Sequence, residues 1–382
     1  MASEAETGAQ DSSGSAGGGR RAHRPSNRLG LDYVREAERL GRPPVPMIDV
    51  HTHIGGAEAA RIYRRVADLY GIQRVFSMTQ LEQVPTLQAI FGERMHFIAI
   101  PNYMSENRRY EFNEGFLRRI EQFHELGSRV VKFWVAPRST DVAIEMGDPG
   151  CLKLDAPPRI RAMELAHRLG MIFMVHVADP DTWFATKYKD ANVYGTKLSQ
   201  YEPLERLLDR FDQPWIAAHM GGWPEDLKFI GDLLDRHRNL HLDASATKWM
   251  VRELGRHRRD ELIDFYRRYP GRVLFGSDIL TSDEHLHAEK SVDNEMTAKA
   301  STPEEAFDLY ASRYWALRTM YETGYEGESP IADPDLHMVD PERFDPLDAP
   351  PMRGKSLPPE ILRDLYRDAA VNLFRGVLPG LI

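Results

Sequence analysis

The chain has 382 residues, of which 42% are hydrophobic, and a formal net charge of -9. An acidic chain argues against a nucleic-acid or anionic-membrane binder, and the absence of about 18 consecutive apolar residues argues against a membrane span. The single cysteine, Cys151, excludes an intrachain disulfide and is typical of a reducing compartment. We therefore expect a cytoplasmic protein.

The first residues, 1–27, are small, polar and rich in glycine, and they lack the apolar segment of a signal peptide. Such a composition has nothing to bury against a core, so it predicts a disordered tail. We expect the remaining residues, 28–382, to form one domain.

From residue 47 onward, eight short apolar runs alternate with longer amphipathic segments. The runs span residues 47–53, 74–79, 96–101, 129–135, 171–177, 214–220, 239–245 and 272–278. They lack strict alternation of apolar and polar residues, which predicts strands buried on both faces of a parallel sheet. Eight strands alternating with helices favour a (β/α)8 TIM barrel. The alternative is an open, doubly wound sheet, but the first turn lacks that fold's glycine-rich phosphate loop.

The chain beyond the eighth run is less regular. Residues 281–356 contain one helical pattern, 303–323, followed by a stretch rich in proline and aspartate. Excursions of this length usually form lids or interfaces, and a homodimer through this segment is compatible with the pattern. Residues 357–376 predict a final amphipathic helix that packs back on the barrel.

Residues able to bind a metal or to transfer protons stand at or near the ends of five predicted strands. They are His51 and His53, Lys132, His176, His219 and Asp278. In a barrel, the carboxyl ends of the strands meet at one mouth, and imidazoles with a carboxylate suit a borderline divalent ion such as zinc. The ordered set therefore predicts a metal site. A second H-x-H pair, His285 and His287, lies in a polar loop, where we expect solvated rim residues.

The motifs at these strand ends carry a family resemblance. "DVHTH", "MVHV", "AHMGG" and "LFGSD", with the late "AAVNLF" helix, resemble the amidohydrolase superfamily over residues 47–278 and the last helix. They are most similar to the amidohydrolase-2 branch, which includes aminocarboxymuconate semialdehyde decarboxylase. The resemblance implies a metal-dependent barrel enzyme. It also implies that His51, His53, His176 and Asp278 are the metal ligands and that His219 is the acid/base or oxyanion-side group.

Lys132 leaves the number of metal ions open. In binuclear relatives a carboxylated lysine on the fourth strand bridges two metals, whereas decarboxylase-like relatives use one metal without it. Lys132 is therefore a carbamate ligand, a partner for a substrate carboxylate, or a paired structural lysine. We favour one divalent ion, zinc or else Mn²⁺, with Lys132 as a residue of the site.

Other residues are candidates for supporting roles. Trp134 either stacks on a substrate ring or belongs to the core, and Trp183 is a candidate for a wall of the substrate pocket. Arg313 and Arg318 are candidates for binding a substrate carboxylate, although we favour a solvated helix face for both arginines. Asp243 and Ser245 end the seventh predicted strand, where they are candidates for orienting a ligand histidine.

Our leading hypothesis is a hydrolase that cleaves an amide, ester, lactone or C–C bond in a small carboxylated or cyclic molecule. Water activated by the metal attacks, assisted by Asp278 and His219. The alternative is non-oxidative decarboxylation of an aromatic or enoic acid by the same residues. A non-catalytic barrel that serves as a scaffold or sensor is a third hypothesis, and the complete ligand set argues against it.

Overall fold

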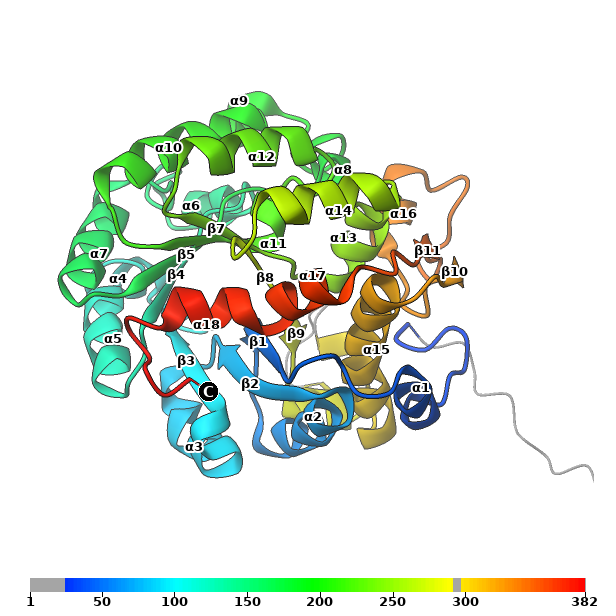
Figure 1. Cartoon of the computed structure of the whole chain (residues 1–382). Coiled ribbons are helices and arrows are strands. Elements are labelled where there is room, and N and C mark those ends of the chain that lie inside the picture. The colour runs from blue at the N-terminus through cyan, green and yellow to red at the C-terminus, as the bar shows by residue number, and fades with distance from the viewer. Residues whose placement is uncertain (1–24, 291–296, 382) are drawn as a thin grey trace, which may run out of the picture.

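The structure, a computed structural model, describes residues 25–290 and 297–381, and it contains a closed parallel barrel (Figure 1). The strands run β8-β7-β6-β5-β4-β3-β2-β1-β9 across the sheet, and every neighbouring pair is parallel. Their bounds are β1 Met47–His53, β2 Ile72–Ser77, β3 Met95–Ala99, β4 Val130–Trp134, β5 Ile172–His176, β6 Trp215–Ala217, β7 Leu240–Asp243, β8 Val273–Leu274 and β9 Ile279–Leu280. The predicted (β/α)8 fold is confirmed.

Within the eighth predicted strand, residues 272–278, only β8 is a strand, and the short β9 follows directly after the predicted range. β8 pairs with β7 and β9 pairs with β1, so this part of the chain closes the barrel. Between them Asp278 adopts a φ of 59°, which bends the backbone, while its N–H still donates to the carbonyl of His51 at 2.8 Å. Gly276 is required here, because a Cβ would lie 2.9 Å from the Cβ atoms of both His51 and Ser245.

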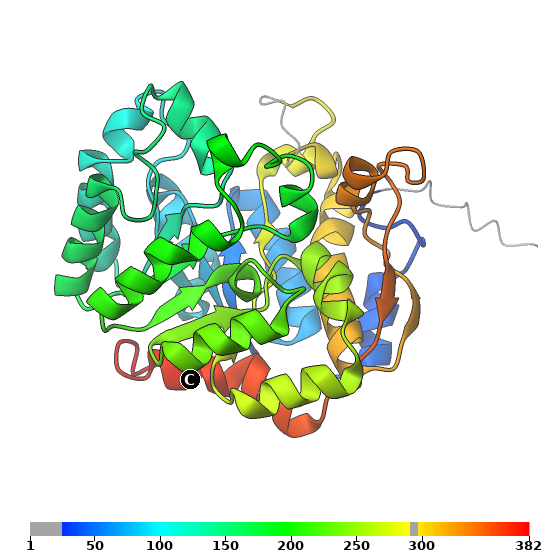
Figure 2. The same ribbon diagram turned by 90° about the horizontal axis from the view of Figure 1, so that it is seen from above.

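Helices surround the barrel and bury their apolar faces against it (Figures 1 and 2). The helices of the barrel region are α1 Tyr33–Leu40, α2 Ala57–Tyr70, α3 Val84–Phe91, α4 Arg108–Glu111, α5 Glu114–Glu125, α6 Ser139–Glu145, α7 Pro157–Arg168, α8 Asp181–Phe184, α9 Ala191–Tyr194, α10 Tyr201–Arg210, α11 Ala218–Gly221, α12 Leu227–Arg236, α13 Thr247–Arg252 and α14 Arg259–Arg268. In the part of the chain that the structure describes, no helix is both long and apolar enough to cross a membrane.

The excursion after the barrel is more ordered than its sequence suggests. It contains α15 (Pro303–Glu322), the antiparallel pair β10 (Glu326–Glu328) and β11 (Pro351–Arg353), and α16 (Pro334–Val339). Most side chains of α15 are buried, and Tyr314 of this helix donates to the carboxylate of Asp49 on β1 at 2.8 Å. This helix is therefore part of the core, whereas α16 lies beside α8 near the barrel mouth.

Both ends of the described chain pack on the barrel. Residues 1–24 of the expected tail lie outside the described residues, but Ser26 and Asn27 are buried, and Asn27 donates to Asp308 of α15 at 2.8 Å. Packed structure thus begins before residue 28. The final segment comprises α17 (Pro359–Arg363), a π turn and α18 (Ala369–Phe374), drawn red in Figure 1. The π turn leaves the carbonyl of Leu365 free to accept from Phe275 beside β8 at 3.0 Å.

Candidate metal centre at the barrel mouth

Three of the predicted ligands converge at the carboxyl ends of β1 and β8. The Nε2 atom of His53 lies 3.1 Å from Oδ1 of Asp278, and Nε2 of His51 lies 3.5 Å from the same oxygen. One ligand atom from each of these three residues falls within 4.8 Å of the others. The strand period places both histidines on one face, and the left-handed backbone of Asp278 turns its carboxylate toward them.

His51 is oriented from behind by Asp243 at the end of β7. Its Nδ1 donates to Oδ2 of Asp243 at 2.7 Å, so the Nε2 lone pair faces the cluster. Burial opposes the charge on Asp243, but the interaction and hydrogen bond with His51, together with the nearby His219 and Lys132, outweigh it and hold the pKa of this carboxyl well below its usual range. Asp243 is therefore an ionised acceptor, as expected for a residue that orients a ligand histidine.

His219 sits on the same scaffold but with a different neighbour. Its backbone is left-handed, with φ 59°, and its N–H donates to Oδ1 of Asp243 at 2.9 Å. The hydroxyl of Ser245 donates its single proton to Asp243, so its oxygen accepts from Nδ1 of His219 at 2.7 Å. Burial, and next the neighbouring His176, lower the pKa of His219 well below its usual value. A neutral imidazole with its proton on Nδ1 leaves Nε2 as an acceptor.

His176 stands apart from the three converging ligands. Its ring centroid lies 4.4 Å from that of His219, but its Nε2 contacts Oδ1 of Asp179 at 2.7 Å. Asp179 is held in turn by the hydroxyl of Tyr188 at 2.5 Å. His176 is therefore at the mouth as expected, yet its ring must rotate away from Asp179 before Nε2 can join His51, His53 and Asp278.

Lys132 on β4 is buried and points into the same cluster. Its Nζ lies 3.4 Å from Nε2 of His51. Burial lowers the pKa of Lys132 to about 8, although the carboxylates of Asp243 and Asp278 oppose the shift. The amine is thus a residue of the site, and its role there stays a prediction.

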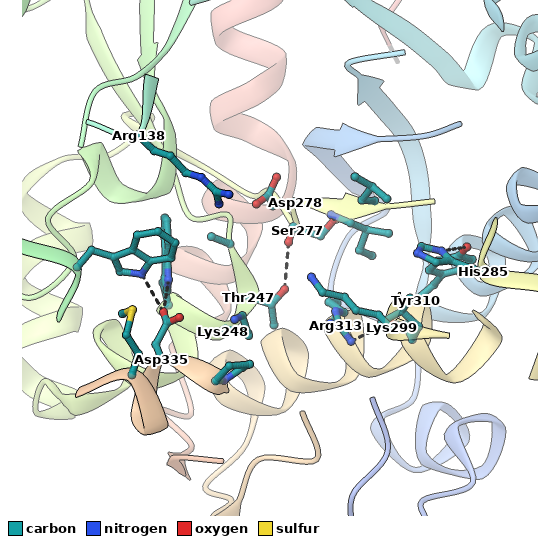
Figure 3. Close-up of a pocket in the computed structure, with 18 of the residues that line it drawn as sticks. Arg138, Thr247, Lys248, Ser277, Asp278, His285, Lys299, Tyr310, Arg313 and Asp335 are labelled. Carbon is teal, nitrogen blue, oxygen red and sulfur yellow. Dashed lines mark hydrogen bonds between the residues drawn. The ribbon is translucent and has the colours of Figure 1, made fainter. Parts of the chain in front are cut away.

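A cavity of about 310 Å³ opens beside Asp278 (Figure 3). One wall carries two indoles, from Trp183 after β5 and Trp249 in α13. Arg138, which follows β4, points toward Asp278 in Figure 3, and its guanidinium has no carboxylate within ion-pair distance among residues 25–290 and 297–381. Figure 3 also shows Lys248 and Asp335 at the rim. The cavity therefore offers aromatic faces and free positive charge next to the metal-binding groups.

The predicted substrate residues are distributed unequally around this cavity. Trp183 lines it, whereas Trp134 lies outside it, 6.3 Å from the ring of Tyr103. Arg318 requires a correction: it is fully buried and its guanidinium pairs with Glu322 at 2.6 Å, so it cannot reach a substrate. Arg313 lines the cavity but donates to the carbonyl of Leu309.

Other residues of the cavity differ from the sequence-based expectation. His285 was expected at a solvated rim, but it is buried, lines the cavity and contacts the hydroxyl of Tyr310 at 2.9 Å. Arg138, Trp249 and Asp335 were missed. The first two follow β4 and β7 by a few residues, so a search of the loops beyond the strand ends would have included them. Asp335 comes from the excursion and carries no such signal.

The donor set fits a divalent metal ion. Two imidazole nitrogens and one carboxylate oxygen are the ligand types that zinc and similar ions prefer, and Asp243 holds one of these imidazoles in the tautomer that a metal requires. His51, His53 and Asp278 would bind the ion, and the rotation of His176 would supply a fourth ligand.

Comparisons with known proteins give a family match and similar solved structures. A model described as "Amidohydrolase" matches residues 110–376, a range that includes His176, His219 and Asp278. A comparison with curated proteins finds no match. Among solved structures, the chain is similar to 2,6-dihydroxybenzoate decarboxylase from Rhizobium and to a 2,6-dihydroxybenzoate decarboxylase complexed with 2,6-dihydroxybenzoate. Each similarity has 15% identity and a TM-score of 0.32, and covers 72% of this chain and 99% of the other.

Proposed function

The chain belongs to the amidohydrolase family, and on that premise we propose that it is a metal-dependent hydrolase of small carboxylated molecules. The observation that carries the proposal is the convergence of His51, His53 and Asp278 on one point at the barrel mouth, beside a cavity. A family fold alone does not define an activity, whereas these three groups have a specific chemistry.

Different residues of the chain would have different roles in hydrolysis. A divalent ion, which we propose to be a single zinc, supplies Lewis-acid activation of water or of a substrate oxygen. The carboxylate of Asp278 takes a proton from the attacking water. Nε2 of His219, free because Nδ1 donates to Ser245, accepts a proton or a hydrogen bond at the same mouth. Arg138 binds a substrate carboxylate through its exposed guanidinium.

The test combines metal analysis with an activity screen. We expect purified protein to contain about one divalent metal ion per chain and chelation to abolish turnover. Small aromatic and enoic carboxylic acids, together with esters, lactones and amides, are assayed in ¹⁸O-labelled water while carbon dioxide is monitored. Incorporation of ¹⁸O into the product supports hydrolysis, whereas release of carbon dioxide without it means a carboxy-lyase. A metal content near two would favour a carboxylated Lys132.

The second H-x-H pair supplies a matched control. His53→Asn removes a proposed ligand, whereas His287→Asn makes the same change at an exposed histidine outside the site. We expect the first variant to lose metal and turnover and the second to retain both. Equal retention of metal by the two variants, or no metal in protein expressed in supplemented medium, would contradict the proposal.

A further inference from the structure

A single oxygen of the excursion holds both indoles of the cavity wall. Oδ2 of Asp335, in α16, accepts from Nε1 of Trp183 and from Nε1 of Trp249, each at 3.0 Å. Trp183 lies in α8 and Trp249 in α13, the helices that follow β5 and β7, so Asp335 joins two separate segments of the barrel mouth. A third donor, Nη2 of Arg252, reaches the same oxygen at 3.0 Å.

The carboxylate of Asp335 is buried and held in place by ion pairs. Asp335 is only 6% exposed, and Arg252, its counter-charge, is equally buried. The neighbouring Asp333 accepts from Nη1 of Arg252 and caps α16 by accepting from the N–H of Asp335 at 3.3 Å. α16 is therefore fastened to the barrel by a desolvated arginine, and Asp335 presents its oxygen to the indoles from a rigid position.

The indole pair connects this anchor to the proposed active site. The ring centroids of Trp183 and Trp249 are 6.1 Å apart at an interplanar angle of 78°. Trp249 stands at 90° to His219 with 5.4 Å between centroids. The Nζ of Lys187 lies 4.2 Å from the ring centroid of Trp183. The wall thus contacts His219 through Trp249 and carries a cation against Trp183.

We propose that Asp335 is a positioning residue for this tryptophan wall, and that the wall selects planar, conjugated carboxylates over saturated ones. An aromatic or conjugated group packs on the indoles with about 0.5–1.5 kcal/mol beyond area burial, which a puckered ring of the same size does not gain. The carboxylate of such a molecule meets the exposed guanidinium of Arg138 across the cavity. The identification of this molecule as a substrate rests on the proposed function.

The experiment measures binding rather than turnover. Benzoate and cyclohexanecarboxylate carry the same charge and the same number of carbon atoms, and only the first is planar. We expect calorimetric titration of the full chain to give a benzoate affinity roughly three- to tenfold higher than that of cyclohexanecarboxylate. Asp335→Asn, which removes the charge that orders both indoles, should bring this ratio close to one and shift the tryptophan emission maximum.

Two further variants separate positioning from general stability. Asp333→Asn alters the same helix and the same arginine but contacts neither indole, so it should keep the wild-type ratio and emission. Trp249→Leu removes one ring while leaving the charged groups intact, and it should lose the preference even if Asp335→Asn folds poorly. An absent preference in the wild type, an unchanged ratio in Asp335→Asn, or an equal loss in Asp333→Asn overturns the proposal. Because no turnover is measured, failure of the hydrolase proposal would show separately, in metal content and product formation.

Discussion

Two polar clusters lie close to the cavity, and they differ in how many of their nitrogen atoms are already hydrogen-bonded or ion-paired. The histidine cluster comprises His51, His53, His219, Asp243, Ser245 and Asp278, and the arginine cluster comprises Arg252, Glu253, Asp333 and Asp335. In the histidine cluster the Nδ1 atoms of His51 and His219 are hydrogen-bonded, while Nε2 of His51 lies 3.4 Å from Nζ of Lys132 and 3.5 Å from Oδ1 of Asp278. In the arginine cluster, Nε, Nη1 and Nη2 of Arg252 each meet a different carboxylate.

The difference separates a binding site from a structural anchor. Imidazole rings whose tautomer is fixed through Nδ1, with Nε2 beside other possible ligands, are what a metal ion needs. A cluster in which every donor meets an acceptor has nothing to offer a ligand, and its contribution is to fix the position of one chain segment on another. Charge alone does not distinguish the two clusters, because both contain carboxylates and cationic or ionisable nitrogen groups, but the side chains of His53 and Asp278 are 35% and 31% exposed.

The largest effect should follow from a substitution in the histidine cluster, at Asp278. Asp278→Asn preserves shape and tolerates the left-handed backbone of this position, because asparagine adopts that conformation more readily than most residues. It removes a charged ligand and the proposed base, so we expect bound metal to be lost and kcat to fall by about 10²- to 10⁴-fold. Metal analysis with kinetics on an active substrate from the screen checks this. Full metal occupancy with unchanged kcat would refute the role.

The next largest effect should come from removing the buried cation of the arginine cluster. Arg252→Met removes the buried cation that pairs with Glu253, Asp333 and Asp335 and leaves them only the more exposed Arg256 and Lys248, which should lower the free energy of unfolding by about 3–5 kcal/mol. Urea denaturation measures this change. Arg256→Met is the matched control, because Arg256 pairs with the other oxygen of Glu253 at 3.1 Å but its side chain is 71% exposed. The control should lower the free energy of unfolding by less than about 1 kcal/mol. Similar losses in both variants would mean that the arginine cluster is not a structural anchor.

The histidine cluster was far easier to predict from sequence than the arginine cluster. Strand period and strand ends place His51, His53 and Asp278 at one mouth, because those rules are local. The arginine cluster joins Arg252 to residues more than 80 positions later in a segment without periodicity, so only the folded chain brings them together. Arg318 was misassigned for a related reason, because a helical pattern does not reveal that α15 is buried on nearly every side.

Some features of the predicted site depend on side-chain rotamers, which spacing does not determine. His176 occupies the expected strand end, but Asp179 three residues later competes for its Nε2. The eighth strand is divided because Asp278 takes a positive φ, and no sequence rule predicts that conformation for an aspartate within an apolar run. The single zinc ion and the role of Lys132 stay predictions, since both depend on chemistry beyond side-chain placement.

A moderate effect is expected where a residue of the histidine cluster orients a metal ligand without binding the metal itself. Asp243→Asn retains the shape but not the charge that holds the Nδ1 proton of His51 and the Ser245 hydroxyl. We expect metal affinity to fall by about 10- to 100-fold, the usual consequence of losing an orienting partner, rather than to vanish. Competition with a fluorescent chelator measures the change. An affinity equal to that of the wild type would mean that His51 does not need Asp243 to keep its Nε2 lone pair exposed.

The smallest effect tests a buried histidine that belongs to neither cluster. His96, on β3, stacks on Phe76 with 4.9 Å between ring centroids. Burial, and to a lesser extent Arg74, lowers its pKa to about 4. The unfolded chain binds this proton below pH ~6.5, so the neutral histidine contributes its full stability above that pH. The contribution is lost as the pH falls from about 6.5 to 4, because the unfolded state then binds more protons than the native state.

His96→Phe keeps the ring and removes the titration. Between pH 7 and pH 5 its free energy of unfolding should therefore fall by about 2 kcal/mol less than that of the wild type. His241 on β7, whose pKa burial also lowers to about 4, allows the same substitution in a second strand, and two sites this far apart should add. Parallel urea titrations at the two pH values measure the difference. Identical losses in wild type and variant would mean that His96 is protonated in the native state at pH 5, and that a buried imidazole outside both clusters needs no partner to carry charge.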